Sequence, residues 1–146
     1  MRSLKALKEE KGFTIVELII VIVVIGILAV LVITTFSNIQ RRARDTDRQN
    51  DIKSIHSVLE VYYADNGYYP SLTQLTAGLP GMDDNALVPP TDNAATINAA
   101  AATTDKYQYA TDPDNCDNGA NGNCTEYTLS ALLEDGSTFT RSSLAN

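Results

Sequence analysis

The sequence predicts an α+β protein, in which one long N-terminal α-helix packs on a small C-terminal antiparallel β-sheet. Three observations support this class. Apolar residues fill positions 13–36, with a single charged side chain at Glu17. A helical pattern then continues through position 65 without glycine or proline. After position 105 apolar and polar residues alternate, which is typical of half-buried strands.

The apolar segment is long enough to cross a membrane. Its 24 residues (13–36) would form a helix ~36 Å long, against a hydrocarbon core of ~30 Å. Glu17 at membrane depth costs about 2.5–3.5 kcal/mol and therefore needs a partner. No lysine or arginine lies between Lys11 and Arg41. A cut after Gly12 would instead free the Phe13 amine, four positions before Glu17 on the same helix face.

The residues Lys11-Gly12 followed by Phe-Thr-Ile-Val-Glu, and the aliphatic stretch after them, resemble the N-terminus of type IV prepilins and pseudopilins. The resemblance implies that prepilin peptidase cuts between Gly12 and Phe13 on the cytoplasmic face and methylates the Phe13 amine. It also implies that this amine pairs with Glu17 of a neighbouring subunit during filament assembly. Phe13 and Glu17 are therefore the expected subunit-assembly residues.

With this resemblance the chain divides into four parts: a leader peptide (1–12), a transmembrane and filament-core helix (13–36), an amphipathic helical stem (37–66) and a globular pilin head (67–146). Together they would form a pilin-like lollipop. In the stem, apolar residues recur mainly at three- and four-residue spacings, so one face is expected to pack on the head. Asn66-Gly67 is a helix stop.

Inside the head, Ser71-Leu72-Thr73-Gln74 reads as a capping box that opens a short helix to about Ala77. The alanine-rich segment 94–104 fits a short helix or a mobile loop, and the sequence leaves this open. Strands are expected over 106–110, 125–133 and 138–141, with an Asp-Gly turn before the last. About three antiparallel strands would cover the apolar face of the stem.

Cys116 and Cys124 fall in the part that the resemblance places outside the cytoplasm, where disulfides form. The seven residues between them are turn-forming, so the ends can meet. We expect a disulfide that stabilises the head by roughly 2.5 kcal/mol. Two free thiols in a mobile loop are the alternative.

No cofactor and no metal ligand are predicted. His56 is the single histidine, so a zinc site would lack ligands. The acidic stretch 112–119 suggests calcium, which some pseudopilins bind in this region. The spacing nevertheless fails the EF-hand pattern, because Cys116 takes the second ligand slot after Asp114 and no glutamate follows at the required distance. A solvated acidic turn is expected, with calcium as the alternative.

Charge argues against nucleic acid as a partner. The net charge is −7, and from position 54 onward there are two basic and 12 acidic side chains. An acidic head repels phosphates. The arginine group is Arg41, Arg42, Arg44 and Arg48. Because aspartates are interleaved with it, a salt-bridged stem is expected, and DNA or anionic lipid headgroups are alternative ligands.

No enzyme is predicted, since the sequence lacks a phosphate loop, a histidine pair and any supported nucleophile arrangement. The predicted function is a structural subunit, a pilin of a type IV pilus. It would be made as a single-pass protein of the cytoplasmic membrane, in contact with lipid, and polymerised with identical subunits into an extracellular filament by inner-membrane machinery. The filament would serve motility, adhesion, DNA uptake or secretion. The alternatives are a pseudopilin of a type II secretion or competence system, and a membrane-anchored binding domain that never polymerises.

Overall fold

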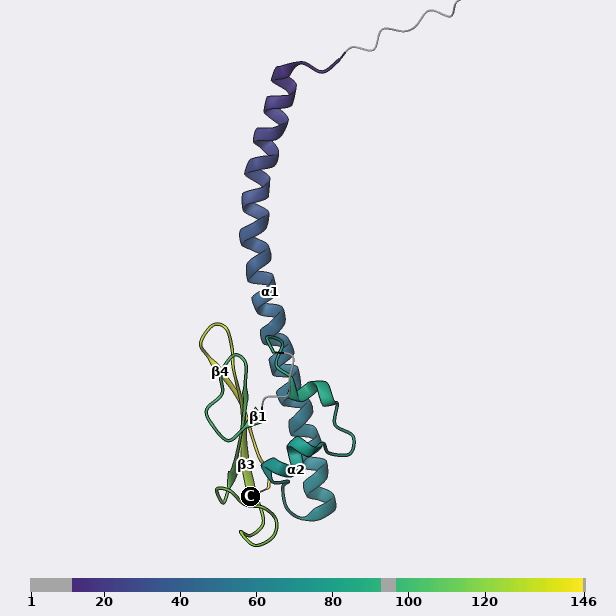
Figure 1. Cartoon of the computed structure of the whole chain (residues 1–146), viewed down its shortest axis with the longest axis vertical. Coiled ribbons are helices and arrows are strands. Elements are labelled where there is room, and N and C mark those ends of the chain that lie inside the picture. Colours follow the sequence, from purple (N-terminus) through teal and green to yellow (C-terminus); the bar gives the residue numbers. More distant parts are fainter. Residues whose placement is uncertain (1–11, 93–96, 146) are drawn as a thin grey trace, which may run out of the picture. The chain divides into compact units, whose positions relative to one another are not determined.

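The computed structural model describes residues 12–92 and 97–145, so residues 1–11 of the expected leader lie outside it. It contains α1 (Ile15–Asn66), α2 (Leu72–Ala77), the short 3-10 helix η1 (Asp84–Leu87), and the strands β1 (Ile97–Asn98), β2 (Tyr107–Asp112), β3 (Glu126–Leu132) and β4 (Thr138–Ser142) (Figure 1). The chain forms two compact units, residues 1–39 and 40–146, and α1 contributes to both. The α+β class predicted from the sequence is confirmed.

Helix α1 has 52 residues and ends where the Asn-Gly stop was expected. Gly67 has a φ of +78°, a left-handed conformation that glycine adopts without steric cost. Its N–H donates to the Tyr63 carbonyl at 2.7 Å, which satisfies one of the helix's last carbonyl groups. The capping box after it is also confirmed, because the Gln74 N–H donates to the Ser71 hydroxyl and the Ser71 N–H to the Gln74 side chain.

In the second unit, the apolar face of α1 packs on the sheet as predicted (Figure 1). Ile52, Ile55 and Leu59 are fully buried on the helix side. Facing residues come from the inward positions of two strands: Tyr107, Tyr109, Tyr127, Leu129 and Ala131. Each fully buried aliphatic side chain contributes about 1.5–3 kcal/mol, so this contact is the main stabilising feature of the head.

The sheet has four strands in the order β1-β2-β3-β4. β2–β3 and β3–β4 are antiparallel, as expected. The prediction of a purely antiparallel sheet was wrong in one respect, because β1 pairs parallel to β2. β1 comes from the segment left open in the sequence, and its two residues, Ile97 and Asn98, are too few to show an alternating pattern. Within that segment the structure describes 97–104 and has no helix there.

Cys116 and Cys124 form a disulfide with their Cα atoms 5.3 Å apart. Asn118 orders the loop between them. Its side-chain N–H groups donate to the Tyr69 carbonyl and the Gln74 side chain at 2.8 and 2.7 Å, and its side-chain oxygen accepts from the Cys124 N–H at 2.8 Å. The loop is therefore joined to the segment that follows α1 as well as to itself.

Candidate functional site

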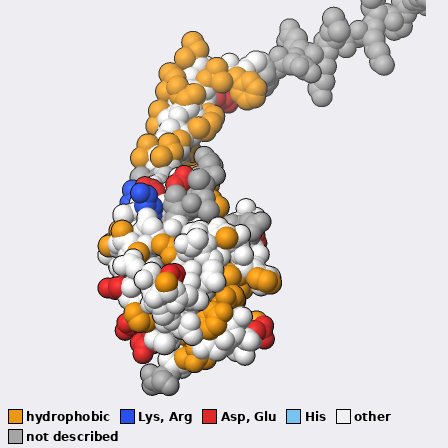
Figure 2. All heavy atoms as spheres, turned by 60° about the horizontal axis from the view of Figure 1, so that its bottom comes forward, with side chains coloured by type: hydrophobic (Ala, Val, Ile, Leu, Met, Phe, Trp, Pro, Cys, Tyr) orange, Lys and Arg blue, Asp and Glu red, His pale blue; other side chains and the backbone are white. Residues whose placement is uncertain are grey.

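The N-terminal unit presents an almost continuous apolar surface. Each residue over 12–33 is exposed, and orange apolar side chains cover the visible side of this helical segment (Figure 2). Such a surface is stable only when something other than water covers it. Among the described residues, α1 is the one helix long and apolar enough to cross a membrane.

Glu17, the single charge of the apolar segment, makes a capping box with Thr14. The Thr14 N–H and the Thr14 hydroxyl each donate to Glu17 Oε2 at 2.7 Å. The Glu17 N–H donates in return to the Thr14 hydroxyl at 3.2 Å. Thr14 is thus the N-cap of α1 and Glu17 the third helical residue, so the carboxylate satisfies N–H groups that a helix leaves without partners.

The sequence interpretation did not recognise this capping box, although it used the same pattern for Ser71 and Gln74. The signal was available, because Thr14-Ile15-Val16-Glu17 has the required threonine and glutamate at a spacing of three. Glu17 therefore has a role in its own helix besides any role toward a neighbour. An experiment on Glu17 must keep these two roles apart.

The structure brings Phe13 and Glu17 to one shallow surface hollow, which Leu18, Ile20 and Val21 complete. The Phe13 side chain is 86% exposed. Gly12, on the other side of the expected cut, has free space around it, since an added Cβ would meet no heavy atom within 4 Å. The residues predicted for cleavage, methylation and assembly are thus adjacent and accessible from outside the chain.

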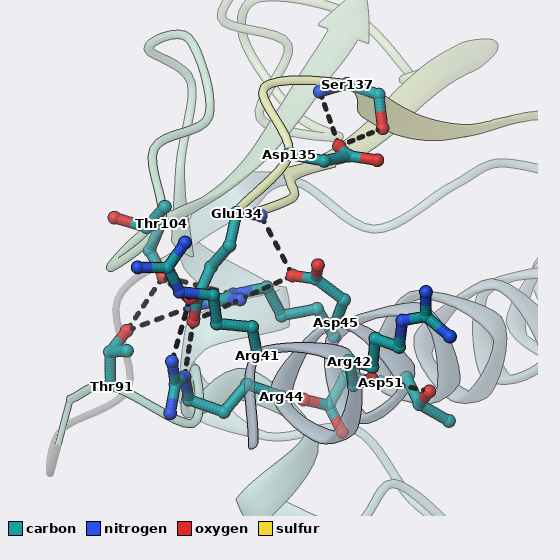
Figure 3. A network of polar contacts seen from close by, with 12 residues as sticks. Arg41, Arg42, Arg44, Asp45, Asp51, Thr91, Thr104, Glu134, Asp135 and Ser137 are labelled. Carbon is teal, nitrogen blue, oxygen red and sulfur yellow. Dashed lines mark hydrogen bonds and ion pairs between the residues drawn. The ribbon is translucent and has the colours of Figure 1, made fainter. Parts of the chain in front are cut away.

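The arginine group of the stem is partly a salt-bridged cluster (Figure 3). Both oxygens of Glu134 accept from Arg44, through Nε and through Nη2 at 2.8 Å. Arg48 is fully buried and donates to Asp45 Oδ1 at 2.8 Å and to the Thr104 carbonyl at 3.1 Å. The Glu134 N–H also donates to Asp45 at 2.9 Å. This cluster ties the stem to the turn between β3 and β4.

Glu134 was not singled out in the sequence, because it lies about ninety residues from its arginine partners. Hydrogen bonds from Arg44, together with the charges of Arg44 and Arg48, hold the pKa of Glu134 below its usual value. The carboxylate consequently stays ionised under mildly acidic conditions.

A second polar cluster surrounds Glu60. Its carboxylate accepts from the hydroxyls of Tyr69 at 3.0 Å and Tyr127 at 2.9 Å. His56, to which the sequence interpretation assigned no chemistry, has Nδ1 2.5 Å from the Tyr127 hydroxyl. Burial, followed by the Glu60 contact, raises the pKa of Tyr127. The partners of this cluster among the described residues lie within the head, so the cluster joins α1 to β3 and to the segment that follows α1.

In the acidic loop of the head, the Asp117 carboxylate bonds to groups of the loop itself. Asp117 accepts from the backbone N–H groups of Gly119 and Asn121, both at 2.9 Å, and from the Asn121 side chain at 3.1 Å. No group of three or more histidine, cysteine, aspartate or glutamate side chains suited to a metal ion occurs in the part of the chain that the structure describes.

A membrane-length helix that starts at an exposed Gly-Phe-Thr-x-x-Glu segment and ends in a small α+β head defines a pilin-like protein. Comparison with known proteins agrees. Residues 7–33 match the prokaryotic N-terminal methylation motif. The type II secretion system core protein G of Escherichia coli (strain K12) is 32% identical over 87 residues, covering 60% of this chain and 58% of that protein. Its namesake in Pseudomonas aeruginosa is 39% identical over 67 residues, covering 46% and 47%.

These matches support the resemblance to type IV prepilins and type II secretion pseudopilins. The chain spans about half the length of the two curated relatives. No solved structure matches it.

Proposed function

We propose that this chain is a filament subunit that is cut after Gly12, N-methylated at Phe13 and polymerised through the apolar half of α1. One observation carries the proposal: the apolar surface over 12–33 is wholly exposed and holds a single carboxylate, beside the residue that would become the N-terminus. A surface of this kind can pass from lipid to the same surface of neighbouring subunits without exposure to water. The subunit would then start in the cytoplasmic membrane and end in a filament.

The partners of this function are identical subunits, a prepilin peptidase and membrane-bound assembly machinery. Glu17 would accept the methylated Phe13 amine of a neighbour. Because an uncompensated carboxylate is costly in an apolar environment, this pairing would fix the axial position of one subunit against the next. Glu17 can do so while its Thr14 contacts persist, since those contacts use Oε2 and leave Oε1 available.

The kind of filament system to which the subunit belongs is inferred from the relatives. Both carry the name of a type II secretion system core protein, which favours a pseudopilin that drives protein secretion. The sequence alone favoured a subunit of a type IV pilus, and this function is now the second candidate. An anchored binding domain that never polymerises is the competing class, and it requires neither a cut leader nor Glu17.

The capping box supplies a sharp test of polymerisation. Glu17→Gln keeps a side chain that can accept the Thr14 N–H, as glutamine does in capping boxes, and removes the charge. Thr14→Ala removes the cap side chain and keeps the carboxylate. We expect Glu17→Gln and Glu17→Ala to be inserted and cut but not assembled, and Thr14→Ala to assemble. The measurement is crosslinking of subunits in membranes, with insertion checked by resistance to alkaline extraction.

Normal assembly of Glu17→Gln together with loss in Thr14→Ala would show that Glu17 acts only as a helix cap, and the proposed pairing would be wrong. A Gly12→Val variant serves as the processing control. Because the glycine has free space around it, loss of cleavage in that variant would report recognition by the peptidase and not a misfolded substrate.

A further inference from the structure

The arginine group of the stem is divided by its contacts into two pairs. Arg44 and Arg48 have partners inside the head: Arg44 holds both oxygens of Glu134, and the side chain of Arg48 is 0% exposed. Arg48 is buried and cannot reach an external ligand, whereas Arg44, whose side chain is 32% exposed, is held by Glu134 through Nε and Nη2. The pair formed by Arg44 and Arg48 is therefore structural.

Arg41 and Arg42 remain at the surface. The Arg41 side chain is 61% exposed, and its Nε lies 3.9 Å from a Glu134 oxygen to which Arg44 Nη2 already donates. The Arg42 side chain is exposed and points away from Glu134 in Figure 3. Within the described ranges, no acidic side chain forms an ion pair with Arg42. Arg41 and Arg42 together have ten N–H donors, five on each side chain. The head leaves most of these donors without an acceptor.

The position of this pair along the chain indicates a ligand. Arg41 and Arg42 follow Phe36 by five and six residues and are the first basic side chains after the apolar segment. A spanning helix that fills the ~30 Å hydrocarbon core is followed by a headgroup layer, which brings the full bilayer to ~40–45 Å. Five further helical residues add ~7.5 Å. Both side chains therefore reach the layer that holds lipid phosphates.

Nearby acidic side chains cancel the positive charge of Arg41 and Arg42 only in part. Asp45 is engaged by Arg48 and by the Glu134 N–H. Asp47 is exposed and opposes an anion, but it lies five residues beyond Arg42. At the level of Arg41 and Arg42 the exposed stem is thus positive, in a protein whose head is otherwise acidic.

We propose that Arg41 and Arg42 bind the phosphate groups of anionic membrane lipids while the subunit resides in the bilayer. Planar guanidinium groups suit phosphate oxygens, which they can hold through two parallel hydrogen bonds. The inference rests on the proposed function only in requiring that residues 13–36 span the membrane. It adds a lipid preference, and hence a step in which the subunit must exchange lipid phosphates for other partners before it leaves the bilayer.

The test uses the full chain reconstituted in phosphatidylcholine vesicles that contain a trace of spin-labelled lipid. Electron paramagnetic resonance gives the fraction of labelled lipid immobilised by the protein, and comparing labelled phosphatidylglycerol with labelled phosphatidylcholine gives the preference. We expect wild type to prefer phosphatidylglycerol, by up to about fivefold per arginine at low salt. Added salt should reduce the preference by screening.

The test variant is Arg41→Gln with Arg42→Gln, and its matched control is Lys53→Gln with Arg141→Gln. The control also removes two positive charges, from side chains that lie over the ring of Phe139 in the head. The preference should fall in the test variant to the level that the remaining basic side chains support, chiefly those of residues 1–12, and stay at the wild-type value in the control.

Three results would overturn the inference: no preference in wild type, an unchanged preference in the test variant, or an equal loss in both variants. If the wild-type chain instead bound duplex DNA through Arg41 and Arg42, these two residues would form a nucleic-acid site and the lipid inference would be wrong. Flotation of the vesicles separates the two proposals. A chain that floats without headgroup preference contradicts the lipid inference alone, whereas a chain that fails to float contradicts the membrane anchor and both proposals with it.

Discussion

Glu17 serves its own helix, and in the proposed filament it would also serve a neighbouring subunit. Its Oε2 receives two hydrogen bonds from Thr14 at 2.7 Å, which stabilise the first turn of α1 before any partner arrives. In the proposed filament the same carboxylate accepts an amine from another subunit. A loss of function on substituting Glu17 therefore has two explanations, and only a substitution that keeps the cap distinguishes them.

Arg48 provides the clearest stability prediction at the residue scale. Its side chain is fully buried, against Asp45 and the Thr104 carbonyl. Arg48→Ala leaves these groups without their cation, and breaking a buried pair in this way costs about 3–5 kcal/mol. We expect a loss of that size in the free energy of unfolding of the head, measured by denaturant titration of the full chain in detergent.

The control for Arg48→Ala is Arg42→Ala, which removes the same charge from an exposed position and should change stability by no more than ~0.5 kcal/mol. Equal losses in the two variants would mean that the buried contacts of Arg48 contribute nothing beyond its charge.

Glu134 gives a prediction for pH. Its pKa is lowered in the folded protein, chiefly by the hydrogen bonds from Arg44. A carboxyl with a lowered folded-state pKa stabilises the fold above its unfolded pKa of ~4.3, and this contribution is lost as the pH falls through the folded value. We expect the free energy of unfolding to decrease on acidification below about pH 4.5. Glu134→Gln should show a flatter dependence over that range, whereas an identical acid profile would exclude Glu134 as its source.

The disulfide loop is the element whose contribution is most easily isolated. Cys116 and Cys124 are separated by eight positions, and closing so short a loop stabilises by roughly 2.5 kcal/mol in the chain-entropy account. The double variant Cys116→Ser/Cys124→Ser should be less stable by about that amount. Reducing agent should lower the stability of wild type similarly and leave the variant unchanged. Thiol alkylation of the unreduced, denatured wild-type chain would contradict the pairing.

The elements that the sequence allowed us to predict depend on patterns close together in the chain. The end of α1 at Asn66-Gly67 and the box at Ser71 and Gln74 each involve a few consecutive residues. β1 could not be predicted, because two residues carry no periodicity and its pairing with β2 depends on the fold of the whole sheet. The Glu134 cluster could not be predicted for the same reason: its members meet only after the sheet has packed on α1.

The molecule as a whole combines an apolar helical surface that needs a partner with a head whose polar clusters around Glu60 and Glu134 are paired internally. The internal clusters around Glu60 and Glu134 use hydrogen bonds that a ligand site would leave available. This contrast favours the N-terminal half of α1 as the seat of the proposed function, and residues 7–33 match the N-terminal methylation motif.

The central claim is that the chain is cut after Gly12 and assembled from a methylated Phe13. The most direct test is intact-mass and N-terminal analysis of the protein from membranes and from the fraction sheared off cells. We predict a chain that begins at N-methyl-Phe13, in membranes for a pseudopilin and also in the sheared fraction for a pilus subunit. A chain that retains residues 1–12 in both fractions would contradict the claim and leave an anchored domain that does not polymerise.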